Sequence, residues 1–597
     1  MARISWIEKR REAKADINQL DANTRDENEL LEQAKDRFES SKAAKVDPRG
    51  RRLHTKWRDM DRLYRGEHWD GHVPAHKSKP VLNFGFAFVE SVVSRMADSN
   101  PRISVFPRRS NKDKRLSELL QHHQNYLWYY NRMQPRFTEA VRSSLKYGST
   151  IFKTVWDPSK YDDLGEVTYR QIAPQNFYND PRAYEIEDME FCFQTALKPI
   201  EYLMRRWPEK SPLILASQRD FDDAEGTQAS TGFGEEAGTV NEYHFFDEEG
   251  RACVMYYCQD VVLDIIGGEY DGSNKPVYEH NRFPFSKADD YTLDKHFWGM
   301  GELEIIEMIQ RLINTFEAQI IDNTRLMSNS QWHVNKALSG LTEDDAAIFN
   351  DMPGAVIFSA SGGVERFEGV GLPAHIPQHL NFLIHAAEQI LGVHDVVQGR
   401  RPEGVRASSA IIALQEAANI RVRQKNRQMD QALSEMADQG NWLILEHYDE
   451  PRHIRMTGQS EVTTLDVRKA LEERMVDRAV MAELQEAGVR PEQLSPEEME
   501  QIFQEVKFPE FDVEVSIGPA TPYSQAMMAE RAIEFFDRGA IDHQALLEMT
   551  NFPGWEEILS RMGGGPPEEE GGERIGERTF GGGPQGGQQP PMRGGDD

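Results

Sequence analysis

The sequence predicts a mixed α+β fold in which helices dominate. Apolar residues recur three and four positions apart over several long stretches, which is the spacing of one face of an α-helix. Between these stretches lie shorter ones that are rich in β-branched and aromatic residues and bounded by glycine or proline, as is typical of strands. The chain has 597 residues, enough for several structural units with a sizeable core.

Charge and composition exclude several classes of protein. The chain carries 69 Lys and Arg residues against 99 Asp and Glu residues, so its formal charge is −30. This excess argues against a protein that coats nucleic acid with its whole surface, but it is compatible with a local basic patch. No apolar run approaches the ~18 residues of a membrane helix, so we expect no membrane association. Only three cysteines occur, and the N-terminal residues are charged where a signal peptide needs an apolar core, which favours a reducing compartment.

Motifs for enzyme chemistry are missing from the sequence. It contains no G-x-x-x-x-G-K-[ST] phosphate loop, no G-x-S-x-G and no H-E-x-x-H. Gly299-Met-Gly301 lacks a third glycine at the right place, so it predicts a helix start and not a cofactor loop. Cys253 and Cys258 lie in an apolar run without a second ligand pair, which favours buried thiols over a metal site. We therefore expect no catalytic residue, no metal and no cofactor.

The first half of the chain predicts an arm followed by an α+β region. Residues 1–50 are highly charged with few apolar positions, which indicates a solvated helical arm. Residues 51–298 start with an aromatic-rich helix that contains Trp57 and is closed by Gly66. Two more predicted helices and five predicted strands follow, at residues 80–100 and 114–147 for the helices and 148–158, 165–172, 191–196, 240–246 and 253–263 for the strands.

The middle of the chain predicts two helices around a small insert. Residues 299–328 form the first helix, because apolar side chains recur there at helical spacing. The residues that carry this spacing are Leu303, Ile306, Ile309, Ile313 and Phe316. Residues 329–373 are of mixed α/β character, with short strands predicted at 332–335 and 354–359, and residues 374–393 form the second helix.

The remaining chain predicts a loop, a long helix and a second helical region. Two glycines and a proline make residues 394–407 a loop. Residues 408–450 predict a long helix, and residues 451–520 predict returning strands around an acidic helical insert. Residues 521–562 are helical again. The Gly- and Pro-rich residues 563–597 cannot bury enough apolar surface to become ordered, so we expect disorder there.

The charge of the chain reverses locally around the predicted loop. Residues 399–427 hold seven bases and two acids. One interpretation is a surface that faces a polyanion; the other, which charge alone favours, is a solvated helix face that pairs with acidic segments of a neighbouring subunit. The bases that follow residue 420 fit the second interpretation. Arg400, Arg401 and Arg406 lie in or beside the glycine loop, where a flexible backbone suits contact with a moving ligand.

The order of these parts resembles the portal proteins of tailed bacteriophages, and the match is closest to portals of short-tailed phages. The resemblance covers roughly residues 50–560, and it rests on the order of several local motifs, because none of them is diagnostic alone. These motifs are Trp57…Tyr64-Arg-Gly66…Trp69, Asn83-Phe…Ser94-Arg…Asn100-Pro101, Ala140…Leu145-Lys-Tyr-Gly148, the stretch from Ile172 to Pro181, and Phe297-Trp-Gly-Met-Gly301…Asn314.

The resemblance implies a ring subunit with wing, stem, clip and crown regions. The wing would comprise residues 51–298 and 408–520, the stem 299–328 and 374–393, the clip 329–373, the tunnel loop 394–407 and the crown 521–562. The residues implied to face DNA are Gln398, Arg400, Arg401 and Arg406, and those implied to dock partners through the clip are Trp332, Asp344, Asp345 and Phe349. Leu303, Ile306, Ile309, Ile313 and Phe316 would pack the stem.

The function that the resemblance implies is a channel for DNA. Portal proteins form rings of about twelve subunits at one capsid vertex, through which double-stranded DNA is packaged and ejected without regard to its sequence. The implied partners are the terminase large subunit, a head-completion or tail adaptor protein, and the major capsid and scaffolding proteins. The chain would be assembled in the host cytoplasm and reside in the virion.

Two other functions remain open from the residues themselves. An enzyme of DNA packaging or processing would need a phosphate loop or a carboxylate cluster on strands, and the sequence shows neither. A soluble assembly scaffold without DNA contact would leave Arg400 and Arg401 without a role in packaging. Substitution of these two arginines therefore separates the scaffold from the portal.

Overall fold

The structure is a computed structural model that describes a large part of the chain. The described residues are 25–69, 74, 77–98, 100–108, 113–210, 214, 237–328, 332–339, 356–359, 364–366, 372–373, 375–392, 420–455, 462–465, 467–469, 511–517 and 522–550. The chain divides into two compact units, residues 1–522 and 523–597, and each is described by itself. Helices and mostly antiparallel sheets make up the described part, so the predicted mixed α+β class is confirmed.

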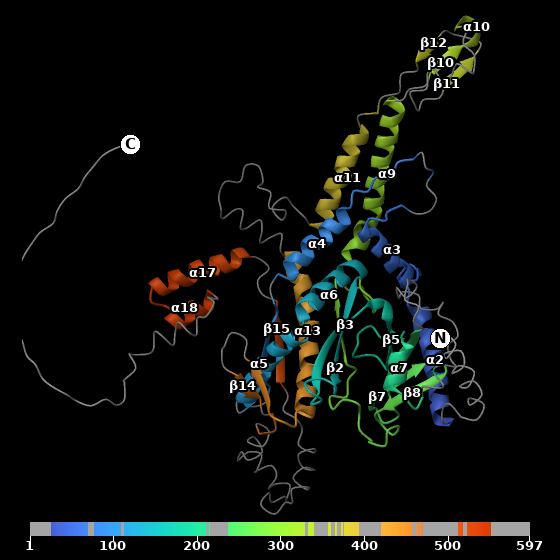
Figure 1. Ribbon diagram of the computed structural model, residues 1–597. Helices are drawn as coiled ribbons and strands as arrows, with labels where there is room; N and C mark the ends of the chain where they lie inside the picture. Colours follow the sequence, from blue (N-terminus) through green and yellow to red (C-terminus); the bar gives the residue numbers. More distant parts are fainter. Residues whose placement is uncertain are drawn as a thin grey trace, which may run out of the picture. The chain divides into compact units, whose positions relative to one another are not determined.

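The helices are shown in Figure 1. Those of the first unit are α2 (Arg25–Ala44), α3 (Leu53–Arg65), α4 (Phe84–Met96), α5 (Lys114–Tyr130), α6 (Met133–Tyr147), α7 (Ile200–Arg206), α9 (Glu302–Ser328), α10 (Lys336–Ser339), α11 (His375–Leu391) and α13 (Ile420–His447), with a 3-10 turn at Pro174–Asn176. From the unit boundary onward lie α17 (Pro522–Asp537) and α18 (His543–Met549). The helix predicted over 114–147 is two helices, because Arg132 adopts a left-handed conformation with φ +50° and interrupts it.

The strands form five sheets in the described part of the chain. They are β1 (Arg102–Pro107), β2 (Ser149–Asp157), β3 (Glu166–Ile172), β4 (Phe177–Asn179), β5 (Phe191–Pro199), β6 (Ala237–Phe246), β7 (Ala252–Cys258), β8 (Val261–Ile266), β9 (Phe285–Asp289), β10 (Trp332–Asn335), β11 (Val356–Ser359), β12 (Val364–Arg366), β13 (Arg452–Arg455), β14 (Val462–Leu465) and β15 (Phe511–Ser516). The sheet orders are β4-β5-β6-β7-β8, β3-β2-β9, β11-β10-β12, β1-β15 and β13-β14. The strand predicted over 253–263 is in fact the hairpin β7–β8, which turns at Gln259 with φ +54°.

Helix α13 forms the centre of the largest hydrophobic core. It packs against β2, β9 and β15, and its buried side chains include Met429, Leu433, Met436 and Ile444. This helix is the described part of the long helix predicted over 408–450. Because β15 pairs with β1 from the other end of the sequence, α13 buries residues from both ends of the first unit in one core.

The N-terminal helix is less solvated than the sequence suggested. Leu30, Leu31 and Ala34 of α2 are buried against aromatic side chains of the five-stranded sheet, Phe193 and Tyr243 among them. The prediction of a solvated arm is therefore wrong for residues 25–44, although their helical conformation is as predicted. The physical reason is that a narrow apolar stripe suffices when the sheet supplies large aromatic partners.

A buried lysine joins the sheet β3-β2-β9 to the five-stranded sheet. Lys153 of β2 forms an ion pair with Glu242 of β6, and its ammonium also donates to Gln194 Oε1 at 2.7 Å. Burial alone would raise the pKa of Glu242, but Lys153 and His244 together hold it well below its usual range. The glutamate therefore stays ionised, and the pair ties the sheets together through a charge-assisted contact.

Backbone packs directly on backbone where α6 ends and α9 begins. Gly148 closes α6 with φ +94°, and a Cβ atom there would lie less than 3.0 Å from the carbonyl of Gly299. A Cβ atom at Gly301 would meet the Leu145 carbonyl at 2.7 Å. The Gly299 amide donates to Ser149 Oγ at 2.9 Å. Gly299 and Gly301 thus precede a helix, as predicted, and no larger residue fits this contact.

We predict that Gly148→Ala destabilises the protein by at least about 3 kcal/mol, because the new methyl group meets the Gly299 carbonyl at a positive φ. The matched control is Gly50→Ala, where φ is +79° but nothing lies within 4 Å. That control should lose only about 1 kcal/mol, since it carries the backbone strain alone. Urea denaturation of both variants measures the difference, and equal losses would show that the close approach has no energetic role.

Candidate functional site

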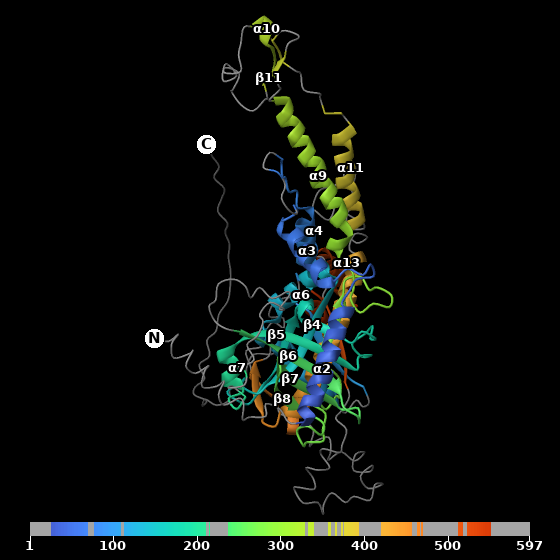
Figure 2. The same ribbon diagram turned by 90° about the vertical axis from the view of Figure 1, so that its right-hand side faces the viewer.

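Helices α9 and α11 form a hairpin that carries the small sheet β11-β10-β12 between them along the chain. They lie side by side in Figures 1 and 2 and contact each other. The rings of Phe316 and His379 meet edge to face at 5.2 Å, and Leu383 and Ala387 of α11 are buried. The hairpin is therefore a packed pair and not two separate arms.

Polar side chains of α9 hold the hairpin against the start of α4. Gln310 Oε1 accepts from the amides of Phe84 at 3.0 Å and Gly85 at 3.3 Å, and its Nε2 donates to the Leu82 carbonyl at 2.5 Å. Asn314 Oδ1 accepts from the Leu82 amide at 3.2 Å. Helix α9 thus satisfies N-terminal amides of α4 that have no partner within α4 itself.

The predicted stem residues divide into two groups. Leu303, Ile306 and Ile313 are fully buried, whereas Ile309 and Phe316 are partly buried. Leu303 and Ile306 belong to the same hydrophobic core as α4, α6 and α13. The first turns of α9 are therefore embedded in the part of the unit built on this core, which we call the body. Only later turns are available to pack against α11 or a neighbour.

Both helices of the hairpin expose large apolar side chains. Met308 is 68% exposed and Leu312 40% exposed, one turn apart on the side of α9 away from Gln310. On α11, Phe382 is 63% and Ile390 42% exposed. Large exposed apolar side chains that gather on one element mark a surface that another protein covers.

A second apolar patch lies on a different side of α9. Val81, Leu82 and Phe86 are each more than a third exposed, and the hydrogen bonds of Leu82 to Gln310 and Asn314 place them on the α4 side of α9. Figure 2 shows α9 between α4 and α11. The unit therefore presents two different apolar patches on two sides of one helix.

The end of α11 and the start of α13 are joined by an arginine. Arg421 Nη1 donates to the Ile390 carbonyl at 2.6 Å, and Gly392 ends α11 with φ +70°. A guanidinium at a helix C-terminus meets carbonyls that carry partial negative charge, which is favourable. The contact brings together the residues that flank 393–419. The predicted DNA-facing residues Gln398, Arg400, Arg401 and Arg406 fall in that segment, outside the described residues.

A buried ionic cluster lies one turn of α13 away from this contact. The Lys425 ammonium pairs with Asp290 and, at 3.0 Å, with Glu302 Oε1. Tyr291 donates its hydroxyl to Glu302 at 2.8 Å, and its ring lies 4.0 Å from the ammonium. Burial raises the pKa of Asp290 to about 7, an effect that Lys425 opposes and the Glu302 charge adds to. The cluster links α13, the start of α9 and the segment after β9.

Only some of the predicted clip residues lie within the described part of the chain. Strands β10 and β11 confirm the two strands predicted around 332–335 and 354–359, and they pair in parallel with Trp332 opposite Val356. The antiparallel strand β12 was not predicted. Trp332 lies in β10, and Asp344, Asp345 and Phe349 lie outside the described residues.

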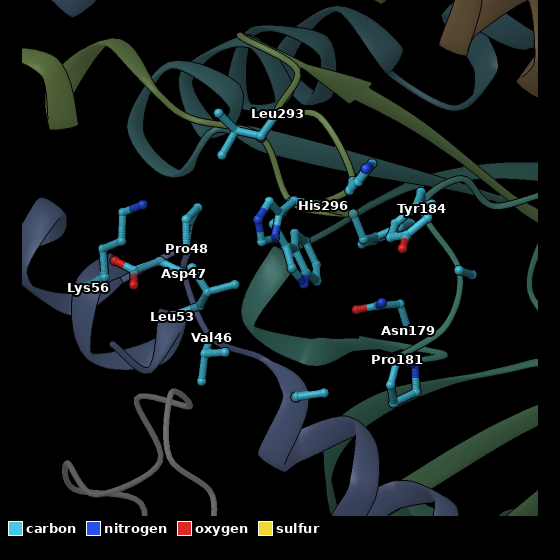
Figure 3. A pocket seen from close by; sticks show the side chains of 16 residues that line it. Val46, Asp47, Pro48, Leu53, Lys56, Asn179, Pro181, Tyr184, Leu293 and His296 are labelled. Carbon is cyan, nitrogen blue, oxygen red and sulfur yellow. The ribbon is translucent and has the colours of Figure 1, made fainter. Parts of the chain in front are cut away.

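Figure 3 shows a pocket at the end of α2 that none of the predicted site residues line. Its lining includes Val46, Leu53, Tyr184, His296 and Trp298. Beside it, the Lys45 ammonium donates to three backbone carbonyls and lies 4.8 Å and 5.0 Å from the rings of Trp57 and Trp298. Burial lowers the pKa of Lys45 well below its usual range. These contacts fasten α2 to the body.

Some site residues were not predicted from the sequence. The sequence signal that could have indicated them is a polar residue within an apolar stripe. Gln310 and Asn314 are one turn apart and lie on the same buried face of the helix as Ile306 and Ile313, where a polar side chain must have a partner. Lys425 is likewise buried within the basic start of α13. The partners themselves come from distant parts of the chain, so spacing alone does not name them.

Two properties of the described residues bear on other functions. In the part of the chain that the structure describes, no cluster of three or more His, Cys, Asp or Glu side chains could hold a metal ion. None of the helices described there is both long and apolar enough to span a membrane.

The comparison with known families decides the identity of the chain. Its sequence matches the family described as Phage P22-like portal protein over residues 46–298 and 301–578. The chain belongs to this family. No curated protein matches it. The resemblance to portal proteins that the sequence motifs indicated is confirmed, and a P22-like family is consistent with short-tailed phages.

Membership assigns a role to the chain. It is a phage portal protein, the head-tail connector that takes part in DNA packaging, and the family is structural and not an enzyme family. Portal proteins are oligomeric ring components of the virion capsid and interact with capsid and terminase proteins.

We predict that Gln310→Leu destabilises the protein by about 2–4 kcal/mol, because the amides of Phe84 and Gly85 lose a buried acceptor. Gln319→Leu on the exposed surface of the same helix should change stability by no more than about 0.5 kcal/mol. Chemical denaturation compares the two variants. A loss at Gln310 as small as that at Gln319 would contradict the role of α9 in capping α4.

Proposed function

We propose that the chain forms a closed ring that conducts double-stranded DNA into and out of the capsid at one vertex. Family membership supports the portal role, and the two apolar patches on different sides of α9 support a ring. Subunits that join through two different surfaces associate head to tail, and such contacts close into a ring when the rotation between neighbours allows it. About twelve subunits are expected for a portal.

The hairpin α9–α11 is the proposed stem of this ring. Met308 and Leu312 on α9, with Phe382 and Ile390 on α11, would face one neighbour. The patch of Val81, Leu82 and Phe86 would face the other neighbour. Residues 329–373 would form the clip, where the terminase large subunit docks during packaging and a head-completion or tail adaptor docks afterwards.

The charge of the chain suits a channel through which DNA slides. Each subunit has a formal charge of −30, and a channel wall of that sign repels phosphates within the ~8 Å screening length at physiological salt. Tight phosphate contacts would raise affinity and slow movement. Arg400, Arg401 and Arg406 in the proposed tunnel loop, residues 394–407, would supply sparse contacts with the passing duplex.

The wing and the crown are the remaining regions of the proposed ring subunit. Residues 51–298 and 408–520 would form the wing, which meets the major capsid and scaffolding proteins, and residues 521–562 the crown. The sequence has no phosphate loop, so a separate ATPase would drive translocation. The ring would assemble in the host cytoplasm before it becomes part of the virion.

We predict that the double variant Met308→Glu, Leu312→Glu abolishes rings but leaves the subunit folded, because charged side chains cannot enter an apolar contact without partners. Mass photometry and negative-stain microscopy should then show single subunits of 68.4 kDa instead of rings of about twelve copies. The control is Tyr202→Glu, another exposed large side chain, on α7. Rings in the double variant would remove this stem interface.

We predict that Arg400→Glu with Arg401→Glu leaves ring assembly intact and reduces DNA packaging or retention, because the reversed charge repels phosphates in the channel. The adjacent exposed pair on α7 offers a matched control, Arg205→Glu with Arg206→Glu. Packaged DNA per particle is the measurement. Normal packaging by the Arg400 and Arg401 variant would remove the tunnel-loop assignment and favour a scaffold without DNA contact.

A further inference from the structure

The cluster of Asp290, Glu302 and Lys425 lies where three segments of the chain meet. Lys425 is in the second turn of α13, Glu302 is the first residue of α9, and Asp290 directly follows β9. All three side chains are buried. The Glu302 amide also donates to Asp290 Oδ2 at 2.9 Å, so the start of α9 is bound by both backbone and side chain.

The neighbouring charges are already engaged with other partners. Asp289 accepts from Ser149 Oγ at 2.7 Å and from Lys287 Nζ at 3.0 Å. Arg421, one turn before Lys425, binds the end of α11 and also acts on Tyr291 through its charge. The groups that face Asp290 are therefore the Lys425 ammonium, the Glu302 carboxyl and the Tyr291 hydroxyl beside it.

The charges of the cluster do not balance when both carboxyls are ionised. Two carboxylates and one ammonium leave one excess negative charge in a place from which water is largely excluded. A proton on Asp290 would remove the excess, and burial favours the less charged state. The pKa of Asp290, raised to about 7, agrees with this arrangement.

One face of α13 holds both helices of the hairpin. Residues 421 and 425 are four apart, so their side chains leave the same face of α13. Arg421 binds the last turn of α11, and Lys425 binds the first residue of α9. The direction in which the hairpin leaves the body therefore depends on these two contacts and on the glycine contact at Gly148.

We propose that Lys425 is the positioning residue that fixes the root of the hairpin on α13, and that the unequal charges of its cluster with Asp290 and Glu302 make this joint stronger in mild acid than in mild base. The proposal deepens the proposed function, because the hairpin is the proposed stem. The joint itself depends only on the fold of one subunit.

The direction of the pH dependence follows from the raised pKa of Asp290 in the folded protein. The folded-state pKa of Asp290 lies above its ordinary value of 3.8, so the folded protein binds the proton more tightly than the unfolded chain does. The stabilising contribution of this group is fully present below about pH 4 and is lost as the pH rises to about 7. Above that pH the contribution stays level.

The test measures thermal midpoints of the full chain at pH 5.5 and pH 8, together with hydrogen exchange in the first turn of α9 and the last turn of α11. Lys425→Met should lower the midpoint more at pH 8 than at pH 5.5, because it leaves two carboxylates buried without a cation. Asp290→Asn should flatten the pH profile, because it removes the group whose proton binding differs between the folded and unfolded states. Combining both substitutions should recover part of the loss that Lys425→Met causes at pH 8.

Other groups also titrate in this range. Burial raises the pKa of Glu446 to about 7 and of Asp430 to about 6. Their contribution is common to parent and variant, so the difference between the two pH profiles isolates Asp290. Glu446→Gln is the control variant; it should change the parent profile but leave the pH dependence of the Lys425→Met loss unchanged.

Equal losses by Lys425→Met at both pH values, without recovery by Asp290→Asn, would overturn the proposal and leave Lys425 as a packing residue. Because Asp290→Asn keeps the side-chain shape, its profile remains informative even if Lys425→Met does not fold. The midpoints require no DNA and no motor. A pH-dependent joint in a chain that forms no rings would therefore support this inference while refuting the proposed function.

Discussion

The structure depends on a contact between backbones at the place where α9 leaves the body. Gly148 and Gly301 let the end of α6 and the start of α9 approach within a distance that no Cβ atom allows. The Asp290 amide donates to the Gly148 carbonyl at 2.9 Å, so β9 joins the same point. The embedded first turns of α9, the capping of α4 by Gln310 and the side-by-side packing of α11 all follow from this placement of α9.

Charge plays opposite roles inside and outside this acidic chain. Outside, the excess of carboxylates fits the proposed channel, along which DNA would move without adhering. Inside the described part of the chain, the buried lysines have defined partners: Lys153 pairs with Glu242, Lys425 with Asp290 and Glu302, Lys146 with Asp61, Lys56 with Glu304, and Lys45 with carbonyls and aromatic rings. Removing one partner of such a group is far more destabilising than replacing the whole group, because an unpaired charge would remain buried. The buried lysines therefore fix which segments meet.

Elements that the sequence predicted well are those whose signals are local. Helix α3 ends at Gly66 in a left-handed cap, and β10 and β11 appear where β-branched and aromatic residues indicated strands. The misses are contacts between distant segments. Strand β1 finds its partner β15 about 400 residues later, α2 docks on a sheet whose aromatic face no local pattern of α2 reveals, and β12 is too short to be recognised by alternation.

The sequence by itself determined the class of the fold, the positions of most helices and strands, the acidic charge and the portal family, because periodicity, composition and motif order are properties of the chain in one dimension. Only the tertiary structure decided which polar residues act together. In the sequence, Lys425 is one base in a basic stretch, and only the structure shows that α13 places it beside Asp290 and Glu302. Gln310 likewise interrupts an apolar stripe in the sequence, and only the structure shows that it accepts from amides of α4. The physical reason is that hydrogen bonds and ion pairs depend on distances of about 3 Å, which packing sets and spacing along the chain does not.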